Sequence, residues 1–199
     1  MFSLFYGLFE YLFRRDEYHV LILGLDKAGK TNVLERLKSM YTHVLGLDPG
    51  KILPTVGLNV GRIEAFGHHL VIWDLGGQSG LQTIWDKYYS ESHAVVYVVD
   101  SANSERFAES KEALDRVLGS SDLHGAPIIL MANKQDLPEA QTPHDVAESL
   151  GFGRVDNRPT KIVPVCAYTG QGLKESVEWL VAMIKRSERT AQLRHKSVK

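Results

Sequence analysis

The stretch Gly24-Leu25-Asp26-Lys27-Ala28-Gly29-Lys30-Thr31 decides the fold of this 199-residue chain. A strand-like apolar run, residues 19–23, comes directly before it, and residues 30–40 follow with helical spacing. The pattern is G-x-x-x-x-G-K-[ST], whose glycines let backbone N–H groups turn toward phosphate oxygens at a helix N-terminus. Lys30 is expected to reach the β- and γ-phosphates, and the Thr31 hydroxyl to ligate Mg²⁺. The strand before and the helix after disfavour the alternative of an ordinary glycine-rich turn, so the sequence predicts a nucleoside triphosphate site.

The composition narrows the class of protein. The length fits one domain with short extensions, and the net charge of −1 argues against bulk nucleic-acid binding as the main task. The single cysteine, Cys166, excludes an internal disulfide and suits a reducing, cytosolic compartment. No apolar run is long enough to cross a bilayer.

Apolar strand-like runs alternate with helical stretches along the body of the chain. The expected strands are residues 19–23, 58–65, 70–74, 95–100, 128–133 and 161–166. The expected helices are residues 30–40, 104–118, 143–150 and 173–189. This rhythm predicts an α/β fold in which a six-stranded, mostly parallel sheet carries helices on both faces. Residues 66–69 indicate a hairpin and therefore one antiparallel edge strand, and a ligand is expected beyond the carboxyl ends of the strands.

A second motif, Asp74-Leu75-Gly76-Gly77-Gln78, follows the third expected strand. Asp74 ends that strand at the same sheet edge as the phosphate loop, where a carboxylate can hold Mg²⁺ through water. Gly77 permits close backbone approach to a γ-phosphate, and the Gln78 amide is placed to orient an attacking water. Alone, this motif is equally consistent with an ordinary turn, but its pairing with the upstream loop favours a functional role.

A third motif, Asn133-Lys134-Gln135-Asp136, follows the fifth expected strand. The Asp136 carboxylate can accept two hydrogen bonds from the ring N–H and the exocyclic amine of guanine, a donor pair that adenine lacks. Asn133 can tie this loop to the phosphate loop, and the stem of Lys134 can cover the purine. Cys166 and Ala167 end the sixth strand, where a backbone N–H can face the guanine carbonyl.

Two further residues bear on how such a site is controlled. Thr55 lies in the long loop before the hairpin, and its hydroxyl can join Mg²⁺ only when a γ-phosphate draws the loop in, which makes a switch. Asp26 adds negative charge beside the phosphates, so we expect it to disfavour the triphosphate-bound state. Without the other motifs, Thr55 is simply a loop threonine.

The order of four motifs along the chain resembles that of the small GTPases. Their residues resemble those of the Arf family: Gly-Leu-Asp-x-Ala-Gly-Lys-Thr, Pro-Thr-Val-Gly-Leu-Asn-Val, Trp-Asp-Leu-Gly-Gly-Gln and Asn-Lys-Gln-Asp. The resemblance covers nearly the whole chain and implies a P-loop GTPase that binds GTP or GDP with Mg²⁺. The residues it assigns to the nucleotide are Gly24, Asp26, Lys27, Ala28, Gly29, Lys30, Thr31, Asn32, Thr55, Gly77, Asn133, Lys134, Asp136, Cys166 and Ala167. It assigns Thr31, Thr55 and, through water, Asp74 to the metal, and Gln78 to catalysis. Asn32 departs from the family by replacing a common second threonine.

The resemblance also implies partners: an exchange factor, a GTPase-activating protein, and effectors that contact Leu58, Trp73 and Tyr88. Leu58 stands where Arf proteins usually carry Phe, so the effector set is expected to differ. Three features point to a non-myristoylated, Arf-like subfamily of the trans-Golgi: the start Met1-Phe2 without a second-place glycine, the lengthened loop 38–53, and residues 81–93. For this subfamily the resemblance implies docking on an integral Golgi membrane protein and a monomer that cycles between cytoplasm and Golgi membrane.

The first 17 residues are expected to form an amphipathic helix, ahead of a GTPase domain at residues 18–185 and a basic tail at residues 186–199. As a helix, residues 2–13 present a wide aromatic face, which suits either permanent packing on the core or reversible attachment to a membrane surface. The tail is expected to be a solvated, fraying helix end.

Two rival functions share the phosphate loop. A nucleoside or nucleotide kinase has no use for Asn-Lys-Gln-Asp and would let ATP compete equally with GTP. A GTP-dependent membrane scaffold with negligible hydrolysis needs the same binding site, and only a measurement of hydrolysis separates it from a GTPase.

Overall fold

The computed structural model describes residues 17–42, 52–153 and 158–196, without the side chains of residues 195 and 196. Its centre is a six-stranded sheet in the order β2-β3-β1-β4-β5-β6. The strands are β1 (Glu17–Leu23), β2 (Leu58–Ala65), β3 (His68–Leu75), β4 (Ala94–Asp100), β5 (Ile128–Asn133) and β6 (Thr160–Pro164). Only the β2–β3 pair is antiparallel, and all other neighbours run parallel. The predicted mostly parallel sheet with one antiparallel edge strand is confirmed.

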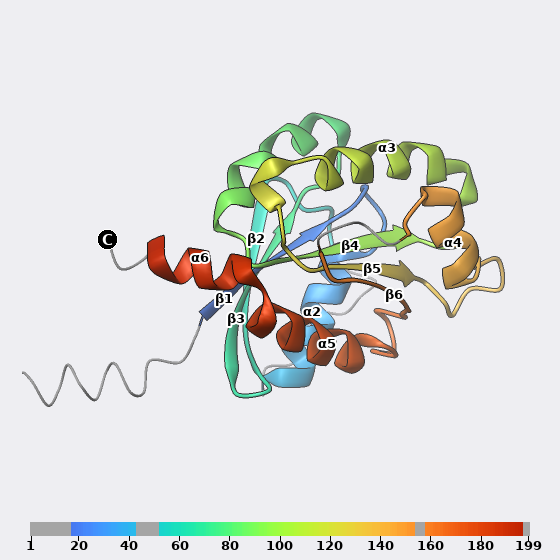
Figure 1. Ribbon diagram of the computed structural model, residues 1–199. Helices are drawn as coiled ribbons and strands as arrows, with labels where there is room; N and C mark the ends of the chain where they lie inside the picture. Colours follow the sequence, from blue (N-terminus) through green and yellow to red (C-terminus); the bar gives the residue numbers. More distant parts are fainter. Residues whose placement is uncertain (1–16, 43–51, 154–157, 197–199) are drawn as a thin grey trace, which may run out of the picture.

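Helices cover both faces of this sheet (Figure 1). The α-helices are α2 (Lys30–Tyr41), α3 (Phe107–Leu118), α4 (Pro143–Leu150), α5 (Leu173–Arg186) and α6 (Glu188–Lys196). Three 3₁₀ segments complete the set: η2 (Ser79–Glu91), η3 (Ser104–Arg106) and η4 (Ser121–Leu123). Among the described helices, none is long and apolar enough to cross a membrane.

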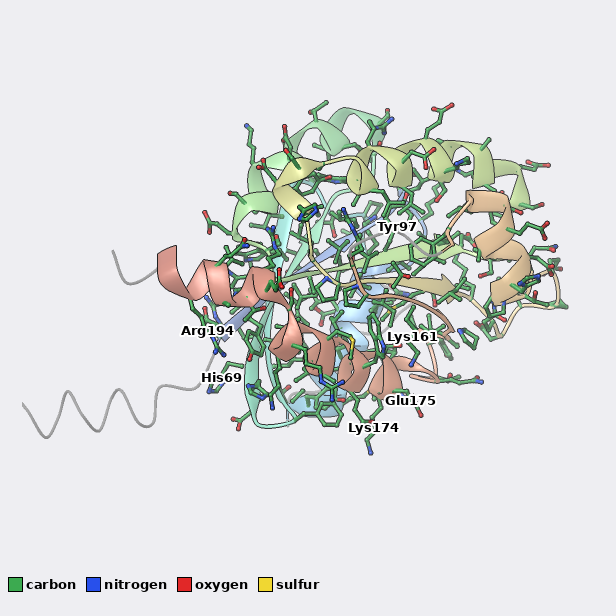
Figure 2. The ribbon with its side chains drawn as sticks, in the orientation of Figure 1. His69, Tyr97, Lys161, Lys174, Glu175 and Arg194 are labelled. Atoms are coloured by element: carbon green, nitrogen blue, oxygen red, sulfur yellow. The ribbon has the colours of Figure 1, made fainter. Side chains whose placement is uncertain are left out.

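Two apolar cores arise because the central strands are buried on both faces, as continuous apolar runs predict. On one face, α2 and α5 pack on alternate residues of the strands, such as Ile22 and Val96. On the other, η2, α3 and α4 pack on the residues between them, such as Leu21 and Tyr97. Tyr97 points from β4 to α3, where its hydroxyl donates to the carbonyl of Ser110 at 2.8 Å (Figure 2).

The hairpin between β2 and β3 turns on two residues, Phe66 and Gly67, with φ values of 52° and 76°. Two positive φ angles belong to the tight turns whose twist matches that of the flanking strands. The predicted four-residue connection was therefore too long, and β3 begins at His68.

The region after residue 185 differs from the expectation of one helix over residues 173–189 with a solvated end. Ser187 is extended (φ −73°, ψ 131°) and separates α5 from α6. Its hydroxyl donates to the Gly125 carbonyl at 3.0 Å and accepts from the Arg189 N–H at 3.2 Å, which fixes the turn. Arg189 and Thr190 are buried, so the start of the tail packs on the domain.

The predicted amphipathic helix over the first 17 residues falls almost entirely outside the described residues. The same holds for most of the lengthened loop 38–53.

Candidate functional site

The phosphate loop runs from the end of β1 to the start of α2, with Gly24 at φ 134° and Lys27 at φ 63°. Gly29, at φ 93°, immediately precedes α2. A Cβ at Gly29 would lie 2.4 Å from Nδ2 of Asn133, so this position needs glycine for both its conformation and its space. Ala28 is buried, Lys27 is exposed, and Asn32 lies half-buried in the first turn of α2. The predicted curl of the backbone before a helix N-terminus is present.

Lys30 is held beneath this loop, where only 6% of its surface is exposed. Its Nζ donates to the Leu25 carbonyl at 2.8 Å. Burial lowers the pKa of Lys30 to about 8, against the raising effect of Asp74 and Asp26. A buried cation with a lowered pKa gains when an anion such as a phosphate comes close.

Thr31, Thr55 and Asp74 bring three oxygen atoms together from three separate segments. Thr31 Oγ1 lies 2.7 Å from Asp74 Oδ2 and 2.7 Å from Thr55 Oγ1, and Thr55 Oγ1 lies 3.1 Å from Asp74 Oδ2. Asp74 is completely buried, and its Oδ1 has no hydrogen-bond partner among the described residues. Burial raises the pKa of Asp74, although the hydrogen bond from Thr31 and the charge of Lys30 oppose this.

This oxygen cluster fits Mg²⁺. The ion prefers hard oxygen ligands at 2.0–2.1 Å, so neighbouring ligands of an octahedral ion lie about 3 Å apart. The hydroxyls of Thr31 and Thr55 are already close to that spacing. The unsatisfied Oδ1 of Asp74 leaves an acceptor for a water molecule of the metal's shell.

The Gly76-Gly77-Gln78 turn packs directly on the phosphate loop. A Cβ at Gly77 would lie 2.3 Å from the carbonyl carbon of Leu25 and 2.4 Å from the Asp26 nitrogen. Two side chains of η2 fasten the turn: Trp85 Nε1 donates to the Gly76 carbonyl at 3.0 Å, and Gln82 Nε2 to the Gly77 carbonyl at 3.1 Å. Gln78 itself is exposed at the start of η2, which leaves its amide accessible to water and to partners.

Asn133 joins the phosphate loop to the loop after β6. The sequence predicts its contact with the phosphate loop. Its Nδ2 donates to the Ala28 carbonyl at 2.8 Å, and its Oδ1 accepts from the Ala167 N–H at 3.0 Å. Cys166 and Ala167 are buried, whereas Asp136 is exposed at the rim. The predicted base-binding segments therefore meet at one end of the sheet.

Lys134 has a partner that the sequence does not reveal. Lys134 follows directly after β5 and has a φ of 66°. Its Nζ donates to Asp100 Oδ2 at 2.6 Å. Asp100 closes β4 at the carboxyl edge of the sheet, and that position is the one sequence signal that could have pointed to it. The ion pair fixes the position of the Lys134 side chain at this edge of the sheet.

Asp26 is not the uncompensated charge that the sequence suggested. Arg106 donates from Nη2 to Asp26 Oδ1 at 2.7 Å and from Nη1 to the Asp26 carbonyl at 2.9 Å. Glu109 holds the other side of the guanidinium, with Nε donating to Oε2 at 2.9 Å. The hydrogen bonds that Arg106 donates to Glu109 and Asp26 raise the pKa of its guanidinium. Sequence reasoning missed Arg106 because it lies 80 residues from Asp26 and in no motif.

The residues expected to contact effectors lie on one side of the hairpin. Val60 pairs with Trp73 and Leu58 with Leu75 across the β2–β3 ladder. The Trp73 and Tyr88 rings pack with centroids 5.5 Å apart. Leu58 is 38% exposed and Val60 39%, so this side presents accessible apolar surface.

Comparisons with known proteins agree with this geometry. The model of the ADP-ribosylation factor family matches residues 5–184. ADP-ribosylation factor-related protein 1 of Rattus norvegicus is 43% identical over 190 residues, and that of Homo sapiens 42%, each covering 94% of both chains. ADP-ribosylation factor-like protein 3 of Saccharomyces cerevisiae is 36% identical over 194 residues, covering 96% of this chain and 97% of the relative.

A solved structure matches as well. The Arl6 BBS3 small GTPase from Trypanosoma brucei, with the bound nucleotide analogue GppNp, is 28% identical with a TM-score of 0.76. The match covers 87% of this chain and all of that one (100%).

Lys30 makes nucleotide affinity depend on pH. Bound phosphates raise the pKa of Lys30 above its free value of about 8, so binding takes up a proton at higher pH and affinity falls as pH rises through 8. We expect the Kd for GDP to rise roughly fourfold between pH 7 and pH 8.5, measured by calorimetry in excess Mg²⁺. Lys30→Arg keeps its charge in this range, and an equal pH dependence in that variant would assign the effect to another group.

The contact between Arg106 and Asp26 should slow nucleotide release. Arg106→Met removes the donors to the phosphate loop, and because the pair is partly exposed we expect GDP to dissociate only about threefold to tenfold faster. Stopped-flow release of a fluorescent GDP measures the rate. Lys111→Met, which breaks the exposed Lys111–Asp115 pair on α3, is the matched control. Equal release rates for the wild type and Arg106→Met would remove Arg106 from the site.

Proposed function

The chain belongs to the ADP-ribosylation factor family, and from this membership we propose that it is a GTP/GDP switch at Golgi membranes. In this proposal it acts in vesicle-mediated protein transport by recruiting effectors when GTP is bound. The observation that carries the proposal is the contact of Thr55 with Thr31 and Asp74. It joins a residue of the segment before β2 to the proposed metal-binding part of the site, so whatever occupies that part would decide where this segment lies.

In this proposal, the nucleotide that binds is a guanine nucleotide. The phosphate loop and the α2 N-terminus face its phosphates, and Lys30 supplies the charge for the β- and γ-phosphates. Asp136 is free at the rim to accept the two guanine donors, while Asn133 holds the base-binding and phosphate loops at a fixed separation.

Thr31 and Thr55 would hold Mg²⁺ directly, and Asp74 through water. When bound, the ion neutralises charge on the phosphate oxygens. Asp74 fixes both hydroxyls in place, because each lies within hydrogen-bond distance of the same carboxylate oxygen. Of the two, only Thr55 belongs to a loop that can withdraw.

Hydrolysis is an in-line attack of water on the γ-phosphate, with Gln78 orienting the water and Lys30 stabilising the negative charge. The exposed position of Gln78 supports slow intrinsic turnover, since no residue in the described part of the chain buries its side chain. Residues 42–54 contain no arginine, and Arg106 is engaged by Asp26 and Glu109. A GTPase-activating protein would therefore supply the missing positioning or charge.

The remaining partners follow from the surface and the N-terminal sequence. Effectors would contact Leu58, Trp73 and Tyr88, whose neighbourhood is apolar and accessible. An exchange factor releases GDP, and residues 2–13 meet the membrane beside an integral Golgi membrane receptor. A short amphipathic helix without an acyl chain binds membranes only reversibly, which is why a receptor is part of the proposal.

Gln78→Leu tests the hydrolytic mechanism. We expect GTP binding to persist, with a tenfold preference or more over ATP, while single-turnover hydrolysis in the presence of Golgi extract slows at least about tenfold. Gln192→Leu, an identical change at an exposed position on α6, serves as the control. Unchanged hydrolysis would exclude Gln78, negligible hydrolysis in the wild type would favour the scaffold, and equal ATP binding would favour a kinase.

Membrane flotation tests the switched anchor. We expect the full chain to float with Golgi membranes when loaded with a non-hydrolysable GTP analogue and to stay in solution with GDP. A chain that lacks residues 1–15 should remain in solution with either nucleotide, because it has lost the aromatic face. Equal flotation of all four samples would defeat the proposed switch.

A further inference from the structure

The C-terminal helix α6 is bonded to the segment that carries the water-positioning and effector residues. Figure 1 shows α6 beside the start of β1, and Figure 2 shows Arg194 on the side of α6 that faces this strand. Arg194 Nη2 lies 3.4 Å from the Tyr18 hydroxyl. The strongest link, however, comes from Arg189 at the other end of α6.

Arg189 is only 8% exposed, and each of its three side-chain nitrogens donates to a backbone carbonyl. Nε donates to the Ser92 carbonyl at 2.6 Å and Nη1 to the His124 carbonyl at 3.4 Å, while Nη2 donates to the Tyr89 carbonyl. Tyr89 lies in the last turn of η2 and Ser92 is its C-cap, where helix carbonyls carry partial negative charge. The Tyr89 carbonyl also accepts from the Ser92 N–H at 3.2 Å, so Arg189 is its second donor. A guanidinium there satisfies the carbonyls and opposes their charge at once.

The bonded end of η2 lies next to the effector side chains. Ser92 Oγ donates to the Tyr88 carbonyl, and Arg189 donates to the carbonyl of the next residue, Tyr89. The backbone that follows Tyr88 is therefore held at two consecutive carbonyls. Tyr88 in turn packs its ring on Trp73. At the other end of η2, Gln78, Ser79 and Gly80 are exposed. The segment is therefore anchored at its C-terminal end and accessible at its nucleotide end.

We propose that Arg189 is a positioning residue of the GTPase site: through it, α6 fixes the end of η2 and thereby sets the placement of Tyr88 and Gln78. The inference rests on the proposed function for the role of Gln78, but the anchoring itself does not. Loss of Arg189 leaves the Ser92 and Tyr89 carbonyls buried without this donor, so η2 opens more easily than its surroundings.

Hydrogen–deuterium exchange of the full-length, GDP-bound chain tests the anchoring. In Arg189→Met we expect amides of residues 79–92 to exchange at least about tenfold faster, because the charge-assisted hydrogen bonds to the Ser92 and Tyr89 carbonyls are lost. Amides of α5 and β4 should change less than twofold. Arg189→Lys keeps a cation and should restore part of the protection, and Arg186→Met, an equal charge change at an exposed site on α5, should leave it intact.

Single-turnover GTP hydrolysis tests whether the anchoring reaches the chemistry. Arg189→Met should slow hydrolysis about threefold to tenfold in the wild-type background and have no effect beside Gln78→Leu. Equal slowing in both backgrounds, exchange that rises uniformly along the chain, or unchanged exchange at residues 79–92 would each overturn the proposal.

Two measurements still decide the proposal if Arg189→Met does not fold or if Gln78 has no part in hydrolysis. If Arg189→Met does not fold, Arg189→Lys must show a smaller exchange increase that is still confined to residues 79–92, and its absence overturns the proposal. If Gln78→Leu alone leaves hydrolysis unchanged, the proposed mechanism fails, whereas the exchange experiment still decides whether Arg189 anchors η2.

Discussion

The buried carboxylate of Asp74 is the interaction on which the site depends. It lies at the end of β3, fully removed from solvent, with one oxygen shared by two threonine hydroxyls and the other without a partner among the described residues. Burial shifts its pKa upward and that of Lys30 downward, so each charged form is disfavoured where it lies. In the proposed site, phosphates and a divalent cation would correct both, because they would bring an anion to Lys30 and a cation toward Asp74. The free energy of nucleotide binding therefore includes the relief of two unfavourable burials.

The strands determine how accurately these groups meet. Ile22 pairs with Asp74 and Leu23 with Tyr97, while Asp100 pairs with Asn133, so the chain leaves the sheet at neighbouring positions. The loops that follow approach so closely that a Cβ at Gly29 or Gly77 would collide with the next segment. Side chains from one loop can then bond the backbone of another, as Asn133 does. The sheet holds the loops in fixed positions, so a side chain of one loop needs to extend only a short distance to contact the next loop.

Much of this could be predicted from the sequence, because the strands are continuously apolar and the motifs are contiguous at their carboxyl ends. Thr31, Asp74 and Asn133 each follow a recognisable strand or loop, and parallel strand ends share one edge. Arg106 and Arg189 could not be found in this way, since each bonds backbone or side-chain groups 80 or more residues distant. The 3₁₀ segment η2 was also missed, although its apolar residues follow helical spacing at Leu81, Ile84, Trp85, Tyr88 and Tyr89. The break at Ser187 depends on the Gly125 carbonyl, a contact invisible to local propensity.

The same distribution of bonds explains how a rigid fold can still respond to one phosphate. Leu53 and Val56 are each 82% exposed, so the segment around Thr55 gains little from burying apolar surface. Its position depends instead on a few polar contacts: the Thr55 hydroxyl with Thr31 and Asp74, and the Gly57 carbonyl, which accepts from the Gly76 N–H at 2.9 Å. Each such contact contributes on the order of 1 kcal/mol, which is small beside what a ligand can supply. At the far end of η2, the buried Arg189 and its three carbonyls oppose movement. In the proposed switch, occupancy of the site would therefore move the segment around Thr55 while the sheet and the anchored end of η2 hold their positions.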